Sequence, residues 1–166
     1  MKKLMAIIVL AIMLMASQLW AAGSCTQTAY STSNPTQAII KFVCTGAADN
    51  GSVPDTATSA ANTAFIDGMY LYTVSAYPTS GGTAPDAADV FILDANGEDL
   101  LGSVDGGTTA NKGLNLIHAT LKKTTMPYSA YLGNAYYPAI TGGLTVKVAN
   151  QATPNANFTI ELTCVR

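Results

Sequence analysis

Short stretches of alternating apolar and polar residues, separated by turns rich in Gly, Pro and Asn, predict an all-β protein. The pattern is that of an antiparallel β-sandwich of the Greek-key or jelly-roll kind. No long amphipathic helical pattern competes with it after the first residues. The 166 residues, 49% of them hydrophobic, are enough for one domain with its own core.

The first 21 residues are typical of a secretory signal peptide, which as a helix precedes a single β-sandwich domain at 22–166. Lys2 and Lys3 are followed by an apolar run, and Ala21 ends a tolerable cleavage site. The run is shorter than the roughly 20 residues that span a bilayer. We therefore expect an exported protein, periplasmic or extracellular, with no stable membrane anchor once the leader is removed. A lipidated Cys25 is the alternative, although Ala22 stands where a lipobox normally has Leu.

In the first half of the domain, a polar strand at 24–32 leads through Asn34-Pro35 into a second strand at 37–44. Residues 45–63 are rich in Gly, Ser, Thr, Asp and Asn, which predicts a long surface loop. A third strand follows at 69–77.

In the second half, 89–94 and 98–103 flank Ala95-Asn96-Gly97. Asn-Gly accepts the positive φ angles of tight turns, so these strands form a hairpin. The range 114–121 fits a strand or a short helix, and 128–137 is ambiguous. The last two strands are expected at 144–149 and 156–164, the latter with four residues facing inward: Phe158, Ile160, Leu162 and Cys164.

Three cysteines in an exported chain predict one disulfide and one remaining thiol. We predict Cys44–Cys164, because both lie at strand ends on inward-facing positions. Cys25 also faces Cys44 if the first two strands pair about Asn34-Pro35, so this pairing stays open. Three buried free thiols are the third possibility.

No cluster of residues in the sequence indicates catalysis, a cofactor or a metal. His118 is the only histidine and stands in an apolar stretch, whereas a catalytic triad needs a nucleophile, a base and an orienting group together. The run Asp94 to Asp99 resembles part of a calcium loop but lacks its distal Glu, so we interpret it as a hairpin turn. We therefore predict no catalytic site, no cofactor-binding site and no metal site.

Tyrosines are numerous, and Tyr favours interfaces because it buries a large area and keeps a polar end. We interpret Tyr70 and Tyr72 as half-buried sheet positions. The predicted contact residues lie further along the chain: Tyr128, Tyr131, Tyr136 and Tyr137.

Four stretches carry a resemblance to a known family: LYTV at 71–74, GTAPD at 82–86, DVFILDANGEDLLG at 89–102, and PAITGGLTV at 138–146. They resemble the "TAPTDNYDITLTDADG" and "LTL" strings of a family of small phage and prophage proteins encoded among virion structural genes. The similarity covers about residues 69–149. It implies a structural component of a phage particle, with no catalytic residues to carry over.

These observations predict a non-enzymatic structural component of a phage or prophage particle, or of a surface assembly, that acts by protein–protein association. Its expected partners are other virion or assembly proteins and further copies of itself. Nucleic acid is not expected, because the net charge is −2 and no basic run is present. The alternative function is a secreted or periplasmic module that binds a carbohydrate or a host surface. The leader fits that alternative, since virion proteins normally assemble in the cytoplasm.

Overall fold

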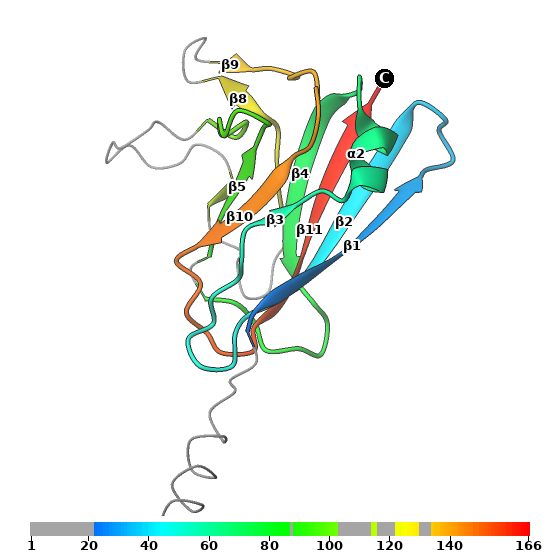
Figure 1. Cartoon of the computed structure of the whole chain (residues 1–166). Helices are drawn as coiled ribbons and strands as arrows, with labels where there is room; N and C mark the ends of the chain where they lie inside the picture. Colours follow the sequence, from blue (N-terminus) through cyan, green and yellow to red (C-terminus); the bar gives the residue numbers. More distant parts are fainter. Residues whose placement is uncertain (1–21, 87, 103–113, 116–121, 130–133) are drawn as a thin grey trace, which may run out of the picture.

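The computed structural model describes residues 22–86, 88–102, 114–115, 122–129 and 134–166. Two antiparallel sheets face each other, which confirms the predicted sandwich (Figure 1). The larger sheet has the order β1-β2-β11-β4-β7, with β1 at Ser24–Ser31, β2 at Gln37–Thr45, β11 at Asn157–Val165, β4 at Tyr70–Pro78 and β7 at Lys123–Thr125. The smaller sheet has the order β3-β10-β5-β6, with β3 at Thr56–Ala57, β10 at Thr145–Ala149, β5 at Asp89–Leu93 and β6 at Leu114–Asn115.

The strand order is that of a jelly roll. Strands pair as β2 with β11, β3 with β10, β4 with β7 and β5 with β6, as in one long antiparallel hairpin. Rolling that hairpin up then places β11 beside β4 and β10 beside β5. A short separate pair, β8 at Tyr128–Ser129 and β9 at Asn134–Ala135, is inserted between β7 and β10. Jelly rolls made of two Greek keys occur in viral capsid and lectin domains.

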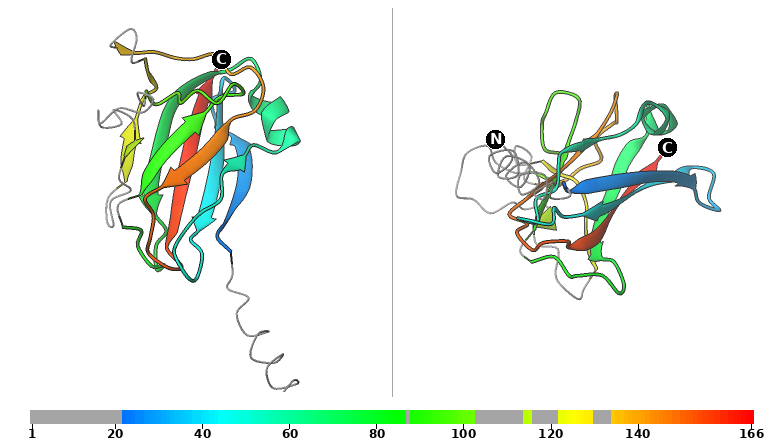
Figure 2. Two further views of the ribbon diagram at one scale, coloured as in Figure 1. Left: turned by 60° about the vertical axis from the view of Figure 1, so that its left-hand side comes forward. Right: turned by 60° about the horizontal axis from the view of Figure 1, so that its bottom comes forward.

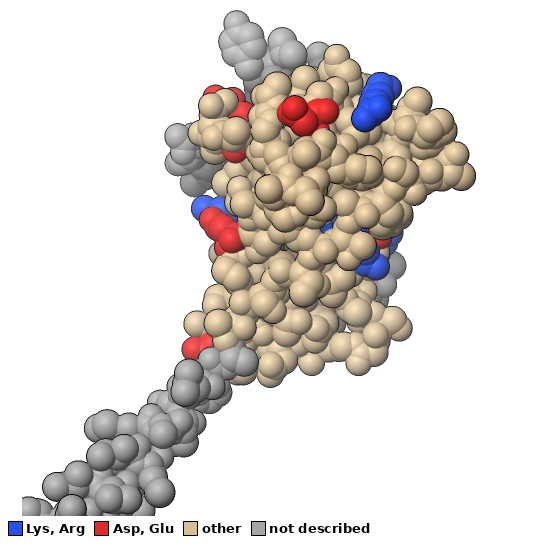
Figure 3. All heavy atoms as spheres, turned by 45° about the vertical axis from the view of Figure 1, so that its right-hand side comes forward, with Lys and Arg blue, Asp and Glu red and all other residues tan. Residues whose placement is uncertain are grey.

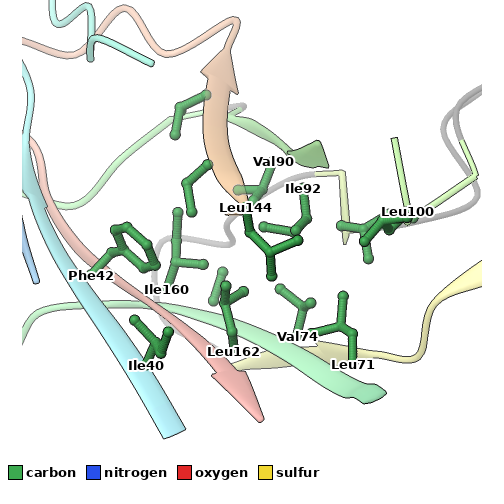
Figure 4. Packing of buried hydrophobic residues seen from close by; sticks show 14 of the residues in the cluster. Ile40, Phe42, Leu71, Val74, Val90, Ile92, Leu100, Leu144, Ile160 and Leu162 are labelled. Atoms are coloured by element: carbon green, nitrogen blue, oxygen red, sulfur yellow. The ribbon is translucent and has the colours of Figure 1, made fainter. Parts of the chain in front are cut away.

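The core lies between the two sheets. In Figure 2, β5 and β10 of the smaller sheet lie across β11 and β2 of the larger one. Figure 4 shows inward side chains from the larger sheet meeting those of the smaller sheet. The labelled members that are almost fully buried are Ile40, Phe42, Leu71, Val74, Val90, Ile92, Leu144, Ile160 and Leu162. Burial of this apolar surface provides most of the free energy that holds the sheets together.

Residues 45–63 are more ordered than the predicted loop. They contain β3, and a short helix, α2, begins among them and spans Ala60–Ile66. The Ser59 side chain accepts a hydrogen bond from Asn62 N and so caps the first turn of the helix. Ile66 is the buried residue of α2. A helix of seven residues is too short to show a helical period in the sequence, and its cap and its contacts with the sheets stabilise it instead.

The predicted turn at Ala95-Asn96-Gly97 is confirmed, whereas its second strand is shorter than predicted. Gly97 has a φ of 84°, and Asp94 N donates to Glu98 O at 2.9 Å. Beyond the turn, only an isolated bridge joins Leu93 and Asp99. The Asp99 carboxylate accepts hydrogen bonds from Ile92 N and Leu101 N, and these replace the ladder that would have continued the hairpin.

The predicted Cys44–Cys164 disulfide is wrong: Cys44 is bonded to Cys25, and Cys164 is a buried free thiol. On β2, Cys44 pairs with Phe158 of β11, while Cys164 pairs with Ala38. Six residues of strand separate Ala38 from Cys44, which is about 20 Å and far beyond the reach of a disulfide. Both side chains face inward as predicted, but they lie at opposite ends of the sheet.

We expect one thiol per chain to become reactive, and only after unfolding. Burial raises the pKa of Cys164 to about 12, so the thiol stays protonated and unreactive in the native protein at pH 8. Alkylation under native and denaturing conditions, followed by non-reducing peptide mapping, should give a Cys25–Cys44 peptide and an alkylated Cys164. A Cys44–Cys164 peptide or three alkylated cysteines would contradict the structure.

Replacing Ile160 by Ala should lower the free energy of unfolding by about 2–5 kcal/mol, because it leaves a cavity at the centre of the core. Chemical denaturation of the two proteins measures the difference. Ser80, an exposed residue of the loop after β4, is the control: Ser80→Ala should change stability by no more than about 0.5 kcal/mol. Equal effects of the two substitutions would show that β11 does not face the core.

Candidate interaction surface

Large apolar side chains reach solvent at one place in particular, around the first residues of β4. Tyr72 and Tyr137 are 40% and 49% exposed, and Met126 is 43% exposed. The Tyr72 and Tyr137 rings stack with centroids 5.3 Å apart at an interplanar angle of 27°. The Tyr137 hydroxyl donates a weak hydrogen bond to Met126 Sδ at 3.7 Å. We call Tyr72, Met126 and Tyr137 the aromatic patch. Tyr70, 47% exposed, lies two residues before Tyr72.

A β-bulge brings Tyr72 into the patch. Along β11, Thr163 pairs with Thr73 and Cys164 pairs with Leu71, so Tyr72 is an extra residue with no partner on β11. Leu71 and Val74 are both fully buried, three positions apart rather than two. A bulge of this kind redirects a side chain without removing its neighbours from the core. Tyr72 therefore turns outward while β4 keeps its place in the sheet.

Backbone hydrogen bonds hold Tyr137 beside this bulge. Leu71 N donates to Pro138 O at 3.0 Å, and Ile140 N donates to Met69 O at 2.7 Å. Tyr136 N donates to Pro127 O, which ties the same segment to the chain just after β7. The segment that carries Tyr137 is thus fixed to two parts of the fold, the start of β4 and the chain after β7.

The four predicted contact tyrosines have different positions. Tyr137 is exposed and belongs to the aromatic patch, whereas Tyr136 is half-buried. Burial raises the pKa of Tyr136, and the negative charges of the turn residues Glu98, Asp94 and Asp99 raise it further. The backbone of Tyr128 forms part of β8, while Tyr131 lies outside the described residues.

The structure shows exposed apolar side chains that the sequence did not indicate. Tyr70 and Tyr72 lie in β4, which confirms that they are sheet positions, but their side chains are exposed rather than half-buried. The buried residues Met69 and Leu71 are two positions apart, whereas Leu71 and the next buried residue, Val74, are three positions apart. This change in spacing is the sign of the bulge in the sequence. Nothing in the sequence around Met126 indicated that its side chain is exposed.

The other residues considered from the sequence form no catalytic or metal site among the described residues. His118 lies outside the described residues. Asp94 Oδ1 accepts hydrogen bonds from Asn96 N at 2.9 Å and Glu98 N at 2.8 Å, which is the arrangement of a turn. Over the described ranges, no group of three or more His, Cys, Asp or Glu side chains is placed to hold a metal ion. Within the same part of the chain, no helix has the length and apolar character needed to cross a bilayer.

A polar cluster lies on the outer face of the larger sheet. The Tyr77 hydroxyl donates to Glu161 Oε1 at 2.6 Å, and Lys122 Nζ lies 3.1 Å from Glu161 Oε2. The same Lys122 ammonium lies 4.8 Å from the centre of the Tyr77 ring. Burial by itself would raise the pKa of Glu161, but the hydrogen bonds from Tyr77 and Lys122 and the charges of Lys122 and Lys41 outweigh burial and lower it. The cluster joins β11 to β4 and to the chain before β7.

Comparisons of the chain with protein-family models, with curated proteins and with solved structures found no match. The functional argument therefore depends on the residues and their geometry.

The lowered pKa of Glu161 predicts a pH-dependent contribution to stability. A carboxylate with a lower pKa in the folded than in the unfolded state stabilises the fold above its unfolded pKa, and this contribution is lost as pH falls through the folded pKa. Glu161→Gln should therefore be less stable than wild type by about 1 kcal/mol at pH 7, and the difference should shrink below about pH 4.5. Tyr77→Phe, which removes one hydrogen bond to the carboxylate, should have a smaller effect in the same direction. Denaturation at several pH values measures this, and parallel profiles for all three proteins would contradict it.

Proposed function

We propose that this protein is a non-enzymatic structural subunit of a phage or prophage particle or of a surface assembly, and that the aromatic patch is its contact with a neighbouring subunit. The observation that carries the proposal is the stacked pair Tyr72–Tyr137 beside Met126, exposed at a fixed place on the fold. Tyrosines of this kind dominate the binding energy of many interfaces. Of the predicted contact residues the patch includes Tyr137, and it adds Met126 and, from β4, Tyr72.

The charge-poor composition supports association as the mode of action. Charged residues make up 11% of the chain, and the face drawn in Figure 3 is mostly uncharged. Burying such a surface against a neighbour costs less desolvation than burying charged groups. The jelly-roll topology supports a structural role, because this fold recurs in viral capsid domains, but it also occurs in lectins and so does not choose between association and sugar binding. The Cys25–Cys44 disulfide is compatible with an exported protein.

The test is incorporation into the assembly. The double variant Tyr72→Ala with Tyr137→Ala should be depleted about 30-fold from purified particles or surface structures, as expected when interface anchors are truncated. Quantitative proteomics of the assemblies measures this. Lys147→Ala is the control, because Lys147 is an exposed residue of β10 that lies outside the patch and outside β1; it should be incorporated like wild type.

Two results would contradict the proposal. Equal incorporation of the double variant and the control would show that the patch is not the contact. A wild-type chain that is absent from particles and surface structures, and that binds a glycan through Tyr72 and Tyr137, would establish the carbohydrate-binding alternative.

A further inference from the structure

Among the described strands, β1 forms one edge of the larger sheet. β1 has β2 as its strand neighbour among the described strands, and the two pair without a bulge over eight consecutive residues, Ser24 to Ser31 (Figure 1). These residues contain no charge and no proline. Natural proteins normally protect long edge strands with Lys, Pro or bulges, because a bare edge pairs with other strands. A bare edge of this length therefore suggests that it is covered in the working protein.

The hydrogen bonds around β1 show which backbone groups face away from the sheet. Thr32 N donates to Gln37 O at 3.3 Å, which extends the β1–β2 ladder beyond Ser31. Cys25 and Cys44 have Cα atoms 4.0 Å apart, the close spacing of a non-hydrogen-bonded pair. Because bonded and non-bonded pairs alternate, four residues of β1 direct their N–H and C=O groups outward: Cys25, Gln27, Ala29 and Ser31.

β1 is also held rigidly in this position. The disulfide fixes Cys25 to β2, and the Gln27 side chain fixes the middle of the strand. Gln27 Nε2 donates to Ala57 O at 2.6 Å, and Gln27 Oε1 accepts from Ser59 N and Asn62 Nδ2. A strand that is already ordered loses little conformational entropy when another strand pairs with it.

We propose that two copies of this chain pair through β1, antiparallel, about a two-fold axis at Thr28. In this register Cys25 faces Ser31 of the second copy, and Gln27 faces Ala29 of the second copy. All four outward-facing residues then find partners, giving about eight hydrogen bonds between the strands. The two larger sheets become one continuous sheet.

A second copy suits this edge because the strand is self-complementary. Pairing about a two-fold axis brings identical surfaces together, so any charge on β1 would lie near its own copy. β1 carries none, and thus no like charges oppose one another across the axis. Figure 3 brings the β1 side forward and shows a largely uncharged surface. In the proposed register Tyr30, 42% exposed, lies opposite Thr26 of the second copy.

The pairing rests on the proposed function only in that both concern association, and it uses a different surface. The first test is cross-linking of the exported mature protein. Thr28→Cys should give a disulfide-linked dimer on a non-reducing gel after mild oxidation, because each introduced thiol lies opposite its own copy in a closely spaced pair. Thr26→Cys is the matched control: it lies opposite Tyr30 of the second copy and should stay monomeric on the gel. Peptide mapping checks that Cys25–Cys44 is intact and that the intermolecular bridge joins the introduced thiols.

The second test weakens the pair without cross-linking it. Thr28→Lys places two ammonium groups opposite each other, and Ala29→Pro removes an outward N–H while leaving the ladder with β2 intact. Each should raise the dimer Kd, measured by sedimentation equilibrium, at least ten-fold. Circular dichroism melting should show both variants folded, and Ser80→Lys, in an exposed loop after β4, should dimerise like wild type.

The outcomes separate this inference from the proposed function. A wild-type chain that is monomeric at every concentration tested, or equal cross-linking at positions 26 and 28, would overturn the β1 pairing. So would a dimer unaffected by both Thr28→Lys and Ala29→Pro. None of these results bears on whether Tyr72→Ala with Tyr137→Ala reduces incorporation into particles, which tests the aromatic patch by itself.

Discussion

The pairing of β11 with both β2 and β4 holds the structure together. β11 is the central strand of the larger sheet, and without it β1–β2 and β4–β7 would be separate pairs. Its inward side chains Phe158, Ile160 and Leu162 are fully buried. Because β11 follows the other described strands in sequence order, the larger sheet cannot close until this segment is available. Contacts between residues so far apart in sequence make such β-topologies slow to fold.

The aromatic patch is a consequence of that same pairing. β11 runs continuously past the bulge, so β4 accommodates one more residue than its partner, and that residue is Tyr72. Placing Leu71 and Val74 in the core leaves Tyr72 with no inward position. The ring is then supported from the side by Tyr137, whose segment is hydrogen-bonded to the start of β4. A surface feature is thus fixed by the register of a buried strand.

The sequence predicted what depends on local alternation and missed what depends on position along the sheet. The strand ranges at 24–32, 37–44, 69–77 and 156–164 are within a residue or two of β1, β2, β4 and β11, because one face of each is buried. The same alternation assigned Cys44 and Cys164 to one face of the sheet. It could not show that they lie at opposite ends of the paired strands β2 and β11. α2 escaped prediction because seven residues contain too few turns for a period. The bulge at Tyr72 was not predicted, because it depends on the register between β4 and β11.

The two edge strands of the larger sheet, β7 and β1, differ in a way that suits assembly. At one end, β7 is three residues long, begins with Lys123 and lies just before Met126 of the aromatic patch. At the other end, β1 is long, uncharged and fixed by a disulfide. A pair of chains joined through β1 would carry one aromatic patch at each far end of a ten-stranded sheet. Two linked copies of a weak contact bind more tightly than one when both reach their partners, because the second contact forms at high effective concentration. The pairing of β1 would thus allow a patch of three exposed side chains to hold a subunit in an assembly that a single copy would readily leave.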